Sequence, residues 1–540
     1  MKTRIFASVF LSLFIYTTSY SQKPKLIVGI VVDQMRYDYI SRYWSKFGDN
    51  GFKRLVTEGY FCKNTNYNYV PTYTAPGHAS IYTGTTPSSH GIIANNWYDR
   101  ESNTMVYCVD DKSVNALGGD TKAGQMSPRK LLNTTIGDQL NLSDNFQSKV
   151  IGIALKDRGA ILPAGKSGKA AYWYDGSTGN WISSTYYMKA LPQWVTEFNN
   201  RAVAKRFLES TWNTLLPIEQ YTESTPDDSP YERPFTGLTK ATFPYVLPEL
   251  MAANEKLNMI RSTPYGNTFT KDFAIETIKA ENMGKGNASD LIAISFSSTD
   301  YIGHQFGPNS VEVEDTYLRL DQDLAELLKF LDEWVGKNNV LVFLTADHGA
   351  AENPTYLKDH SISSGTFNEY ELKGKLKKAM AKEFSDSLVL SVSNQQVFLD
   401  QKAISLKTLK ADKIENSIVD FLLKENGIAN AFPEYNLVNK EYAEGIESVI
   451  KNGYHVKRSG DVMINYLPYW MDSEVKFGTT HGSPYEYDTH VPLIFYGYTI
   501  KPGSTSEKIN ITDIAPTICN LLNIEVPNGT SGKPILQLIR

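Results

Sequence analysis

The sequence predicts an α/β fold: a central, mostly parallel sheet that is flanked by helices and carries two inserted lid or cap regions. Short runs of β-branched and apolar residues alternate with helical patterns, which is typical of a parallel sheet covered on both faces. Charged and imidazole side chains directly follow several of these runs. Because ligands of open α/β sheets bind outside the carboxyl ends of the strands, we expect the functional site at this edge.

The expected elements follow from hydrophobic pattern and composition. The five expected strands span residues 26–32, 150–155, 291–296, 340–344 and 491–496. A long amphipathic helix is expected over residues 311–337, because leucines recur along one stripe. The irregular, aromatic-rich segment from about 170 to 267 is expected to be one insertion. A second insertion is expected from about 351 to 472, with helices near 370–384 and 412–425.

The first residues are typical of an export signal, since Lys2 and Arg4 precede the apolar stretch 5–15. We expect a signal peptide over residues 1–21, cleaved near Ser21, and one domain with its insertions over residues 22–540. The apolar stretch is shorter than the ~20 residues that cross a membrane. The mature chain is therefore expected to have no membrane span and to be periplasmic or extracellular.

Charge and cysteine content limit the partners and the scaffold. The formal net charge of −5, without a long basic run, gives no indication of nucleic acid or an anionic membrane as partner. Three cysteines exclude a disulfide-dense scaffold and zinc held by cysteine clusters. A bridge between Cys62 and Cys108 and three separate buried thiols, with Cys519 as the third, are both compatible with the sequence.

Carboxylates and imidazoles gather where strands end. Six of them are candidate metal ligands: Asp33, Asp300, His304, Asp347, His348 and His481. Three carboxylates and three imidazoles suffice for two zinc ions, each with a position open for substrate. Asp300 and His304 are four positions apart, so both reach one ion if a helix begins after the strand. The remaining histidines are expected to be structural: His78, His90, His360, His455 and His490.

The segment PTYTAPGH, residues 71–78, is expected to enter a helix and to place Thr74 at the helix N-terminus. Backbone amides and the helix dipole there favour an anion such as phosphate. Zinc coordination can hold the Thr74 hydroxyl as a nucleophile without a neighbouring general base. Thr72 is the alternative nucleophile, and a simple helix cap is the alternative role of Thr74.

An ordered series of motifs covers nearly the whole mature chain. It runs from KLIVGIVVDQMRYDY through PTYTAPGHASIYTG, ALKDRGAILPAG, SSTDYIGHQFGPNS and FLTADHGA to GTTHG. The series resembles the alkaline phosphatase superfamily and, within it, the threonine-nucleophile monoesterases of the PafA type. The resemblance implies two zinc sites: one formed by Asp300, His304 and His481, and one formed by Asp33, Asp347 and His348 with Thr74 beside it.

Further roles are implied by the same resemblance. Asn95 resembles the asparagine that hydrogen-bonds a nonbridging phosphoryl oxygen, and Lys156 and Arg158 resemble the pair that recognises monoesters. A monoester dianion has one more charged oxygen than a diester, which a lysine and an arginine fork can bind. The expected function is alkaline phosphatase activity on small-molecule phosphate monoesters through a phosphothreonine intermediate. The alternatives are a phosphodiesterase or nucleotide pyrophosphatase of the same superfamily and a binding protein with structural zinc.

Overall fold

The computed structural model describes residues 23–472 and 476–539. The predicted signal peptide and its cleavage near Ser21 lie outside the described residues. Within the described part of the chain, no helix is both long enough and apolar enough to cross a membrane.

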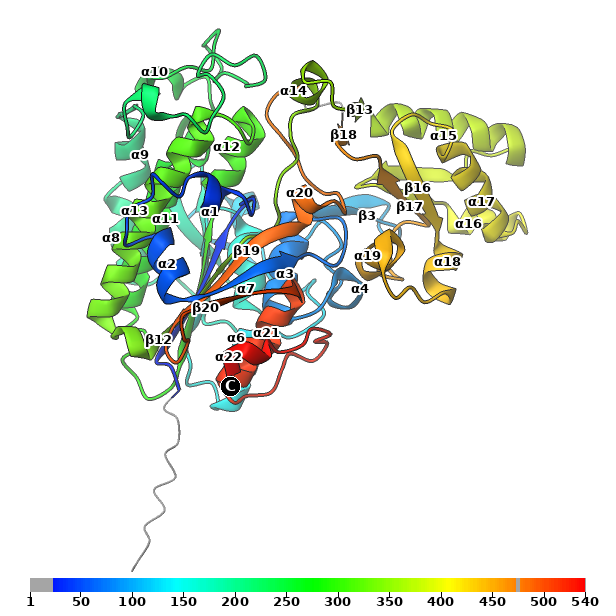
Figure 1. Cartoon of the computed structure of the whole chain (residues 1–540). Coiled ribbons are helices and arrows are strands. Elements are labelled where there is room, and N and C mark those ends of the chain that lie inside the picture. The colour runs from blue at the N-terminus through cyan, green and yellow to red at the C-terminus, as the bar shows by residue number, and fades with distance from the viewer. Residues whose placement is uncertain (1–22, 473–475, 540) are drawn as a thin grey trace, which may run out of the picture.

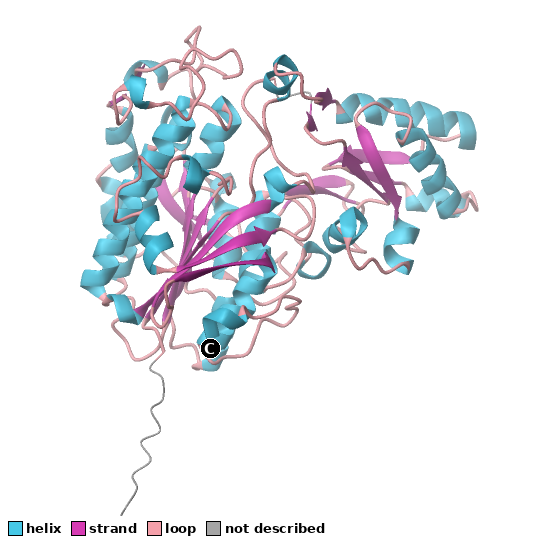
Figure 2. Cartoon of the chain, in the orientation of Figure 1, coloured by secondary structure: helices cyan, strands magenta, loops and turns pink. Residues whose placement is uncertain are grey.

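A ten-stranded mixed sheet forms the centre of the molecule, in the order β20-β2-β19-β12-β1-β11-β6-β7-β8-β5. Its middle strands are parallel: β12 (Val340–Thr345), β1 (Leu26–Val32), β11 (Asp290–Phe296), β6 (Val150–Ala154) and β7 (Ala170–Asp175). β19 (His490–Gly497) pairs antiparallel with β12. The five predicted strands and the predicted α/β class are therefore confirmed, and Figure 2 shows the strands fanned between helices.

The other strands of the sheet were not predicted: β2 (Tyr60–Asn66), β5 (Ala116–Leu117), β7, β8 (Asn180–Ser184) and β20 (Gly503–Asn510). β20 is one of the two edge strands and is mostly exposed, and its sequence GSTSEKIN has no apolar run. β7 and β8 fall at the start of the expected first insertion. They extend the central sheet, with every residue of β7 buried, so that the irregular part of this segment begins after residue 184.

Helices cover both faces of the sheet (Figure 1). One face carries α11 (Tyr265–Ala280), α12 (Ser298–Phe306) and α13 (Val311–Trp334). The opposite face carries α3 (Thr74–Thr83), α6 (Ile136–Ser143), α7 (Asp157–Ala164) and α21 (Ile514–Leu521). α13 begins as predicted, with the Ser310 hydroxyl accepting from Val313 N at 3.2 Å, and ends just before Gly336, whose φ is +86°.

The second insertion forms a separate module, here called the cap domain, from β13 (Gly365–Phe367) to β18 (Trp470–Asp472). Its sheet has the order β14-β15-β17-β16, made of Val389–Ser393, Gln396–Leu399, Val462–Tyr466 and Ile428–Pro433. α15 (Glu369–Phe384) and α17 (Ala411–Leu422), both predicted, pack on this sheet around a hydrophobic core of their own. Figure 1 shows the cap domain beside the main sheet.

Shorter elements complete the chain. They are α1 (Tyr39–Arg42), α2 (Phe52–Glu58), α4 (Pro87–His90), β3 (Asn96–Asp99), β4 (Thr104–Tyr107), α5 (Thr121–Gly124), α8 (Gln193–Asn200), α9 (Val203–Leu208), β9 (Thr211–Trp212), β10 (Tyr245–Val246), α10 (Leu247–Leu250), α14 (Pro354–Asp359), α16 (Gln401–Leu406), α18 (Glu434–Asn439), α19 (Gly445–Gly453), α20 (Glu486–Thr489) and α22 (Leu536–Ile539). Cys62, Cys108 and Cys519 are three buried free thiols, so the bridge between the first two is not formed.

Candidate metal centre and active site

Four neighbouring strands deliver the predicted site residues to one edge of the sheet. β12, β1, β11 and β6 lie side by side and run parallel, so their carboxyl ends meet at that edge. Asp33 follows β1, Lys156 follows β6, and Asp347 follows β12. Asp300 lies in the first turn of α12, the helix that begins directly after β11. The predicted convergence of these side chains is therefore present.

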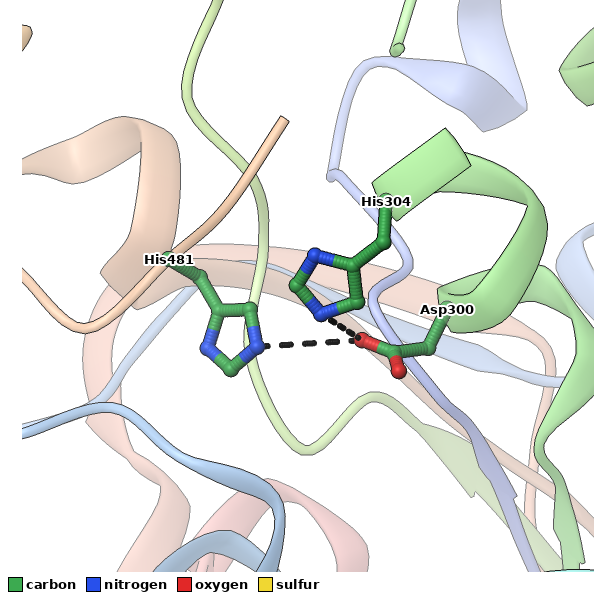
Figure 3. A group of neighbouring side chains, drawn as sticks. All are labelled: Asp300, His304 and His481. Atoms are coloured by element: carbon green, nitrogen blue, oxygen red, sulfur yellow. Dashed lines mark ion pairs between the residues drawn. The ribbon is translucent and has the colours of Figure 1, made fainter. Parts of the chain in front are cut away.

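Asp300, His304 and His481 form the first group that could hold a metal ion (Figure 3). His304 Nε2 lies 3.1 Å from Asp300 Oδ1, and His481 Nε2 lies 3.7 Å from the same oxygen. Asp300 and His304 are one helical turn apart on α12, as their spacing predicted. His481 approaches from the loop before α20, far along the chain.

Asp33, Asp347 and His348 lie together in a second, fully buried group. His348 Nε2 is 3.6 Å from both Asp33 Oδ1 and Asp347 Oδ2. A second group that could hold a metal ion consists of Asp33, Asp300 and His348, whose ligand atoms all lie within 4.8 Å of one another. Asp300 therefore stands between the two groups, and the two candidate sites are contiguous.

The imidazoles of both groups are oriented for metal binding by hydrogen bonds from their other ring nitrogen. Each Nδ1 faces a backbone carbonyl: His304 and Thr479 O at 2.8 Å, His348 and Gly349 O at 3.0 Å, and His481 and Thr72 O at 2.6 Å. Because a carbonyl only accepts, each Nδ1 must carry the proton, and each Nε2 offers its lone pair. Metal-ligating histidines typically have this arrangement.

Unsatisfied buried atoms also fit a bound cation. Asp33 Oδ1, Asp347 Oδ2 and His348 Nε2 are buried without a hydrogen-bond partner. Burial and the neighbouring Asp347 raise the pKa of Asp33 well above its usual range, and burial raises the pKa of Asp347 to about 6. Burial lowers the pKa of His348 to about 3, which keeps its ring neutral. Buried carboxylates beside a neutral imidazole are the donor set that zinc prefers.

Lys156 is the cation that the structure places among these carboxylates. Its buried ammonium lies 2.6 Å from Asp33 Oδ2 and 2.5 Å from Asp300 Oδ2. Burial would raise the pKa of the Asp300 carboxyl, but His304 and Lys156 outweigh burial and hold that pKa well below its usual range. Lys156 therefore compensates one carboxylate from each predicted ligand set.

Thr74 is the first residue of α3 and is almost fully buried. Its hydroxyl is 3.5 Å from the Lys156 ammonium. Gly77, one helical turn after Thr74, lets α3 lie close to Asp347, because a β-carbon at position 77 would lie 2.5 Å from Asp347 O. The rival Thr72 instead uses its hydroxyl to donate to Ser483 O at 3.1 Å, outside the helix. Thr74 therefore lies at the helix N-terminus beside Lys156, which pairs with Asp33 and Asp300.

Asn95 and Arg158 flank the start of α3. Asn95 Oδ1 accepts from Ala75 N at 2.9 Å, which places the amide group of Asn95 against the helix N-terminus. Arg158 donates through Nη1 to Tyr107 OH at 3.0 Å, while its buried Nε has no hydrogen-bond partner. Both side chains could therefore donate to an anion held at the start of α3.

Three residues near the site were not singled out by the sequence. Gln34 donates through Nε2 to Asp300 Oδ1 at 2.8 Å and through its backbone N to Asp347 Oδ1 at 3.1 Å. His78, expected to be structural, lies 3.5 Å from Asp347 Oδ2. Tyr107 positions Arg158. In the sequence, the position of Gln34 next to Asp33 was the one indication of a role at the site, and no local pattern indicated a role for Tyr107.

Comparisons with known proteins show which family the chain is similar to. A family model described as type I phosphodiesterase / nucleotide pyrophosphatase matches residues 27–483. A Myroides odoratus protein named calcium-transporting ATPase is 46% identical over 98% of this chain and 97% of its own length. Alkaline phosphatase PhoV of Synechococcus elongatus is 46% identical over 96% of this chain and 93% of its own. Alkaline phosphatase PafA of Elizabethkingia meningoseptica is 45% identical over 96% of this chain and 95% of its own.

The solved structure of wild-type alkaline phosphatase PafA has a TM-score of 0.92 at 44% identity, covering 96% of this chain and 99% of that one. The chain therefore belongs to the type I phosphodiesterase / nucleotide pyrophosphatase family, which is part of the alkaline phosphatase superfamily. Within that superfamily it is a PafA-type member.

Proposed function

We propose that this hydrolase removes phosphate from small-molecule monoesters at a two-zinc site, through a covalent phosphothreonine intermediate on Thr74. The assignment of phosphoric monoester hydrolysis is supported by the 45–46% sequence identity to the PhoV and PafA alkaline phosphatases over nearly the whole chain. The observation that supports the mechanism best is the position of Thr74, at a helix N-terminus beside two contiguous Asp/His groups.

The residues suit zinc in number, donor type and orientation. Asp300, His304 and His481 would hold one ion, and Asp33, Asp347 and His348 the other, with Thr74 beside the second. When bound, zinc would act as a Lewis acid toward the phosphoryl oxygens, the Thr74 hydroxyl and the leaving oxygen. The proposal does not require a third metal ion.

The proposed reaction consists of two successive displacements at phosphorus, and residues of this chain position the reacting groups in both. Thr74 Oγ attacks phosphorus in line, the Oγ–P bond forms, and the bond to the alcohol oxygen breaks on the opposite side, toward His304 and His481. The Thr74 hydroxyl loses its proton as the Oγ–P bond forms, and the alcohol oxygen takes up a proton as it leaves. Water then attacks the phosphothreonine, phosphate is released, and Thr74 regains its hydroxyl. Since phosphoryl transfer has a loose transition state, positioning and charge stabilisation are the main tasks.

Asn95, Lys156 and Arg158 would bind the nonbridging oxygens. Asn95 donates an amide N–H, and Lys156 and Arg158 supply two positive charges for the dianion. This pair favours monoesters over diesters, because a diester lacks the additional charged oxygen. A phosphodiesterase or nucleotide pyrophosphatase remains the alternative, since the matching family model has that description.

The terminal phosphoryl group of ATP offers the same three nonbridging oxygens as a simple monoester. We therefore expect this site to hydrolyse ATP as well, but with a lower kcat/KM than for an uncharged monoester, because the leaving group, ADP, is itself strongly anionic. The ATPase named in Myroides odoratus is consistent with such a substrate. Action in the periplasm or outside the cell, after removal of the predicted signal peptide, is part of the same proposal.

The function is tested by steady-state hydrolysis of nitrophenyl phosphate and its matched diester at alkaline pH, before and after zinc removal and restoration. We expect the monoester to be strongly preferred and activity to disappear and return with zinc. Preference for the diester would assign the chain to the alternative activity. Cleavage of neither substrate by the zinc-loaded protein would rule out both.

A further inference from the structure

A pocket of about 180 Å³ opens between the metal-binding loop of His481 and the cap domain. On the side of the main domain it is lined by Tyr73, the residue before Thr74, and by Thr480 and His481. The ring of Tyr73 packs edge-on against His481, with ring centroids 5.6 Å apart. The pocket therefore begins beside His481, on the side toward which the alcohol would leave in the proposed mechanism.

The cap domain builds the opposite wall. The turn between β14 and β15 reaches the main domain through Asn394 and Gln395. Gln395 Nε2 donates to Gly482 O at 3.0 Å, next to His481, and Asn394 Nδ2 donates to Asn96 O at 2.7 Å, next to Asn95. The same turn thus contacts both sides of the proposed phosphate site, which fixes the pocket relative to the reacting group.

Glu369, the first residue of α15, is held in this wall. Its Oε1 accepts from Gln395 N at 2.9 Å and from Tyr466 OH at 2.8 Å. Two hydrogen bonds to one oxygen fix the orientation of the carboxylate. A fixed negative charge therefore faces the space that the leaving group would fill.

The pocket has an acidic character. Glu369 and Asp488 supply two carboxylates, and no lysine or arginine is among the described residues that line it. Arg36, the base whose charge acts on Asp488, is engaged in ion pairs with Asp38 and Glu352. Lys156 and Arg158 are not among the lining residues. Positively charged side chains therefore lie at the proposed phosphate site, whereas carboxylates line the pocket.

We propose that this pocket binds the leaving group and selects polar alcohols that are uncharged or cationic over alcohols that carry a negative charge. The inference rests on the proposed function. A second anionic group on the substrate would lie near the Glu369 carboxylate, in a pocket whose described lining includes no lysine or arginine. Such an approach of like charges is unfavourable at short range in a partly enclosed site. Hydroxyl and ammonium groups would instead donate to the carboxylate and amide oxygens of the wall.

The test compares kcat/KM for glycerol phosphate, phosphoglycerate and phosphoethanolamine with zinc-loaded enzyme. Glycerol phosphate and phosphoglycerate share a three-carbon skeleton and differ in the charge of the leaving group. We expect glycerol phosphate and phosphoethanolamine to exceed phosphoglycerate about tenfold, which corresponds to ~1.4 kcal/mol. Glu369→Gln retains an oxygen for Tyr466 and Gln395 but removes the charge, and we expect it to reduce this ratio about threefold or more.

Glu371→Gln is the matched control, since Glu371 is exposed on the same helix and outside the pocket. It should leave the ratio unchanged. If Glu369→Gln does not fold, the ratio measured on the unaltered enzyme should fall as salt is raised, because screening weakens the repulsion. Equal kcat/KM for glycerol phosphate and phosphoglycerate, or a ratio that neither Glu369→Gln nor salt changes, would overturn the inference. Hydrolysis of none of the three would instead refute the proposed function.

Discussion

Arg158 and Lys156 both carry a positive charge, but the structure gives them different surroundings. Lys156 is bound by the carboxylates of Asp33 and Asp300, whereas Arg158 is held by Tyr107 and keeps a buried Nε without a partner. In the proposed mechanism, Lys156 would therefore link the two Asp/His groups to the substrate, and Arg158 would contact the substrate alone.

Arg158→Ala should discriminate between monoesters and diesters. We expect kcat/KM for the monoester to fall about 30- to 1000-fold, which is the loss of ~2–4 kcal/mol of charge-assisted hydrogen bonding, and that for the diester to fall far less. Steady-state kinetics on matched nitrophenyl substrates measure both. Arg233→Ala, an exposed arginine outside the proposed site, is the control. An equal loss on both substrates would assign Arg158 a positioning role.

His481→Ala should remove one zinc ion and leave the other. His481 belongs only to the group with Asp300 and His304, whereas the second cluster consists of Asp33, His348 and the shared Asp300. We expect elemental analysis to find about one zinc per chain in place of two, together with loss of hydrolysis. His360→Ala, at an exposed position after α14, should keep both. Full zinc content in His481→Ala would remove His481 from the ligand set.

The sequence could locate Asp33, Asp300 and Asp347 because each follows a buried strand within a few residues, and parallel strands end at one edge. His481 was a candidate ligand from its residue type, but its assignment to the group of Asp300 and His304, like the role of Asn95, came from the resemblance. The contact of Tyr107 with Arg158 joins two segments that share no pattern, so only the folded structure shows it. The zinc assignments and the nucleophile stay predictions.

At the scale of elements, buried strands were easier to predict than edge strands. β1, β11 and β12 are continuous apolar runs with every residue buried. β2 alternates with half-buried polar residues, and β20 lies at the edge, so their sequences resemble loops. β7 lies in the irregular, aromatic-rich segment that was expected to be an insertion, but its residues are buried in the sheet.

The turn between β14 and β15 connects the cap domain to the proposed phosphate site. Gln395→Ala removes the hydrogen bond to Gly482 O beside His481. We expect the free energy of unfolding to fall by ~1 kcal/mol and kcat/KM for a monoester to fall about three- to tenfold, as the His481 loop loses a support. Denaturant titration and kinetics measure these effects. Lys402→Ala, exposed elsewhere in the cap domain, should change neither, and an unaffected Gln395→Ala would show that the turn does not position the loop.

At the scale of the whole molecule, the main sheet and the cap domain have separate hydrophobic cores, joined by the small apolar cluster around Val70 and by polar contacts. The cap domain packs around its own cluster, separate from that of the main sheet. Arg458 of the cap domain donates to Gly91 O at 2.5 Å and to Lys130 O at 2.8 Å, and Asn452 donates to Asn68 O at 2.8 Å. These bonds attach the cap to the chain segments on either side of α3, which carries Thr74.

A buried carboxyl group makes the stability of the fold depend on pH. Glu312, on α13, is fully buried, and burial raises its pKa from the ordinary value of 4.5 to about 8. Because the folded state binds this proton more tightly than the unfolded state, the stability is fully present below about pH 4.5 and is lost as pH rises through about 8.

Glu312→Gln should therefore stabilise the protein at alkaline pH. The amide keeps an oxygen for the hydrogen bond from Tyr245 OH but cannot ionise. We expect a gain in the free energy of unfolding of ~1–3 kcal/mol at pH 9 and little change at pH 5. Glu333→Gln, exposed on the same helix, should have no effect at either pH. A gain of equal size at both pH values would show that the Glu312 proton is not the cause.

The central claim is that Thr74 is the nucleophile of a two-zinc monoesterase. The most direct measurement is the kcat/KM of zinc-loaded Thr74→Ala on a phosphate monoester, beside the wild type and Thr74→Ser. We predict that Thr74→Ala loses activity at least about a thousandfold while both zinc ions stay bound, and that Thr74→Ser, which keeps a hydroxyl, retains far more. Activity of Thr74→Ala within about tenfold of the wild type, at full zinc content, would contradict the mechanism.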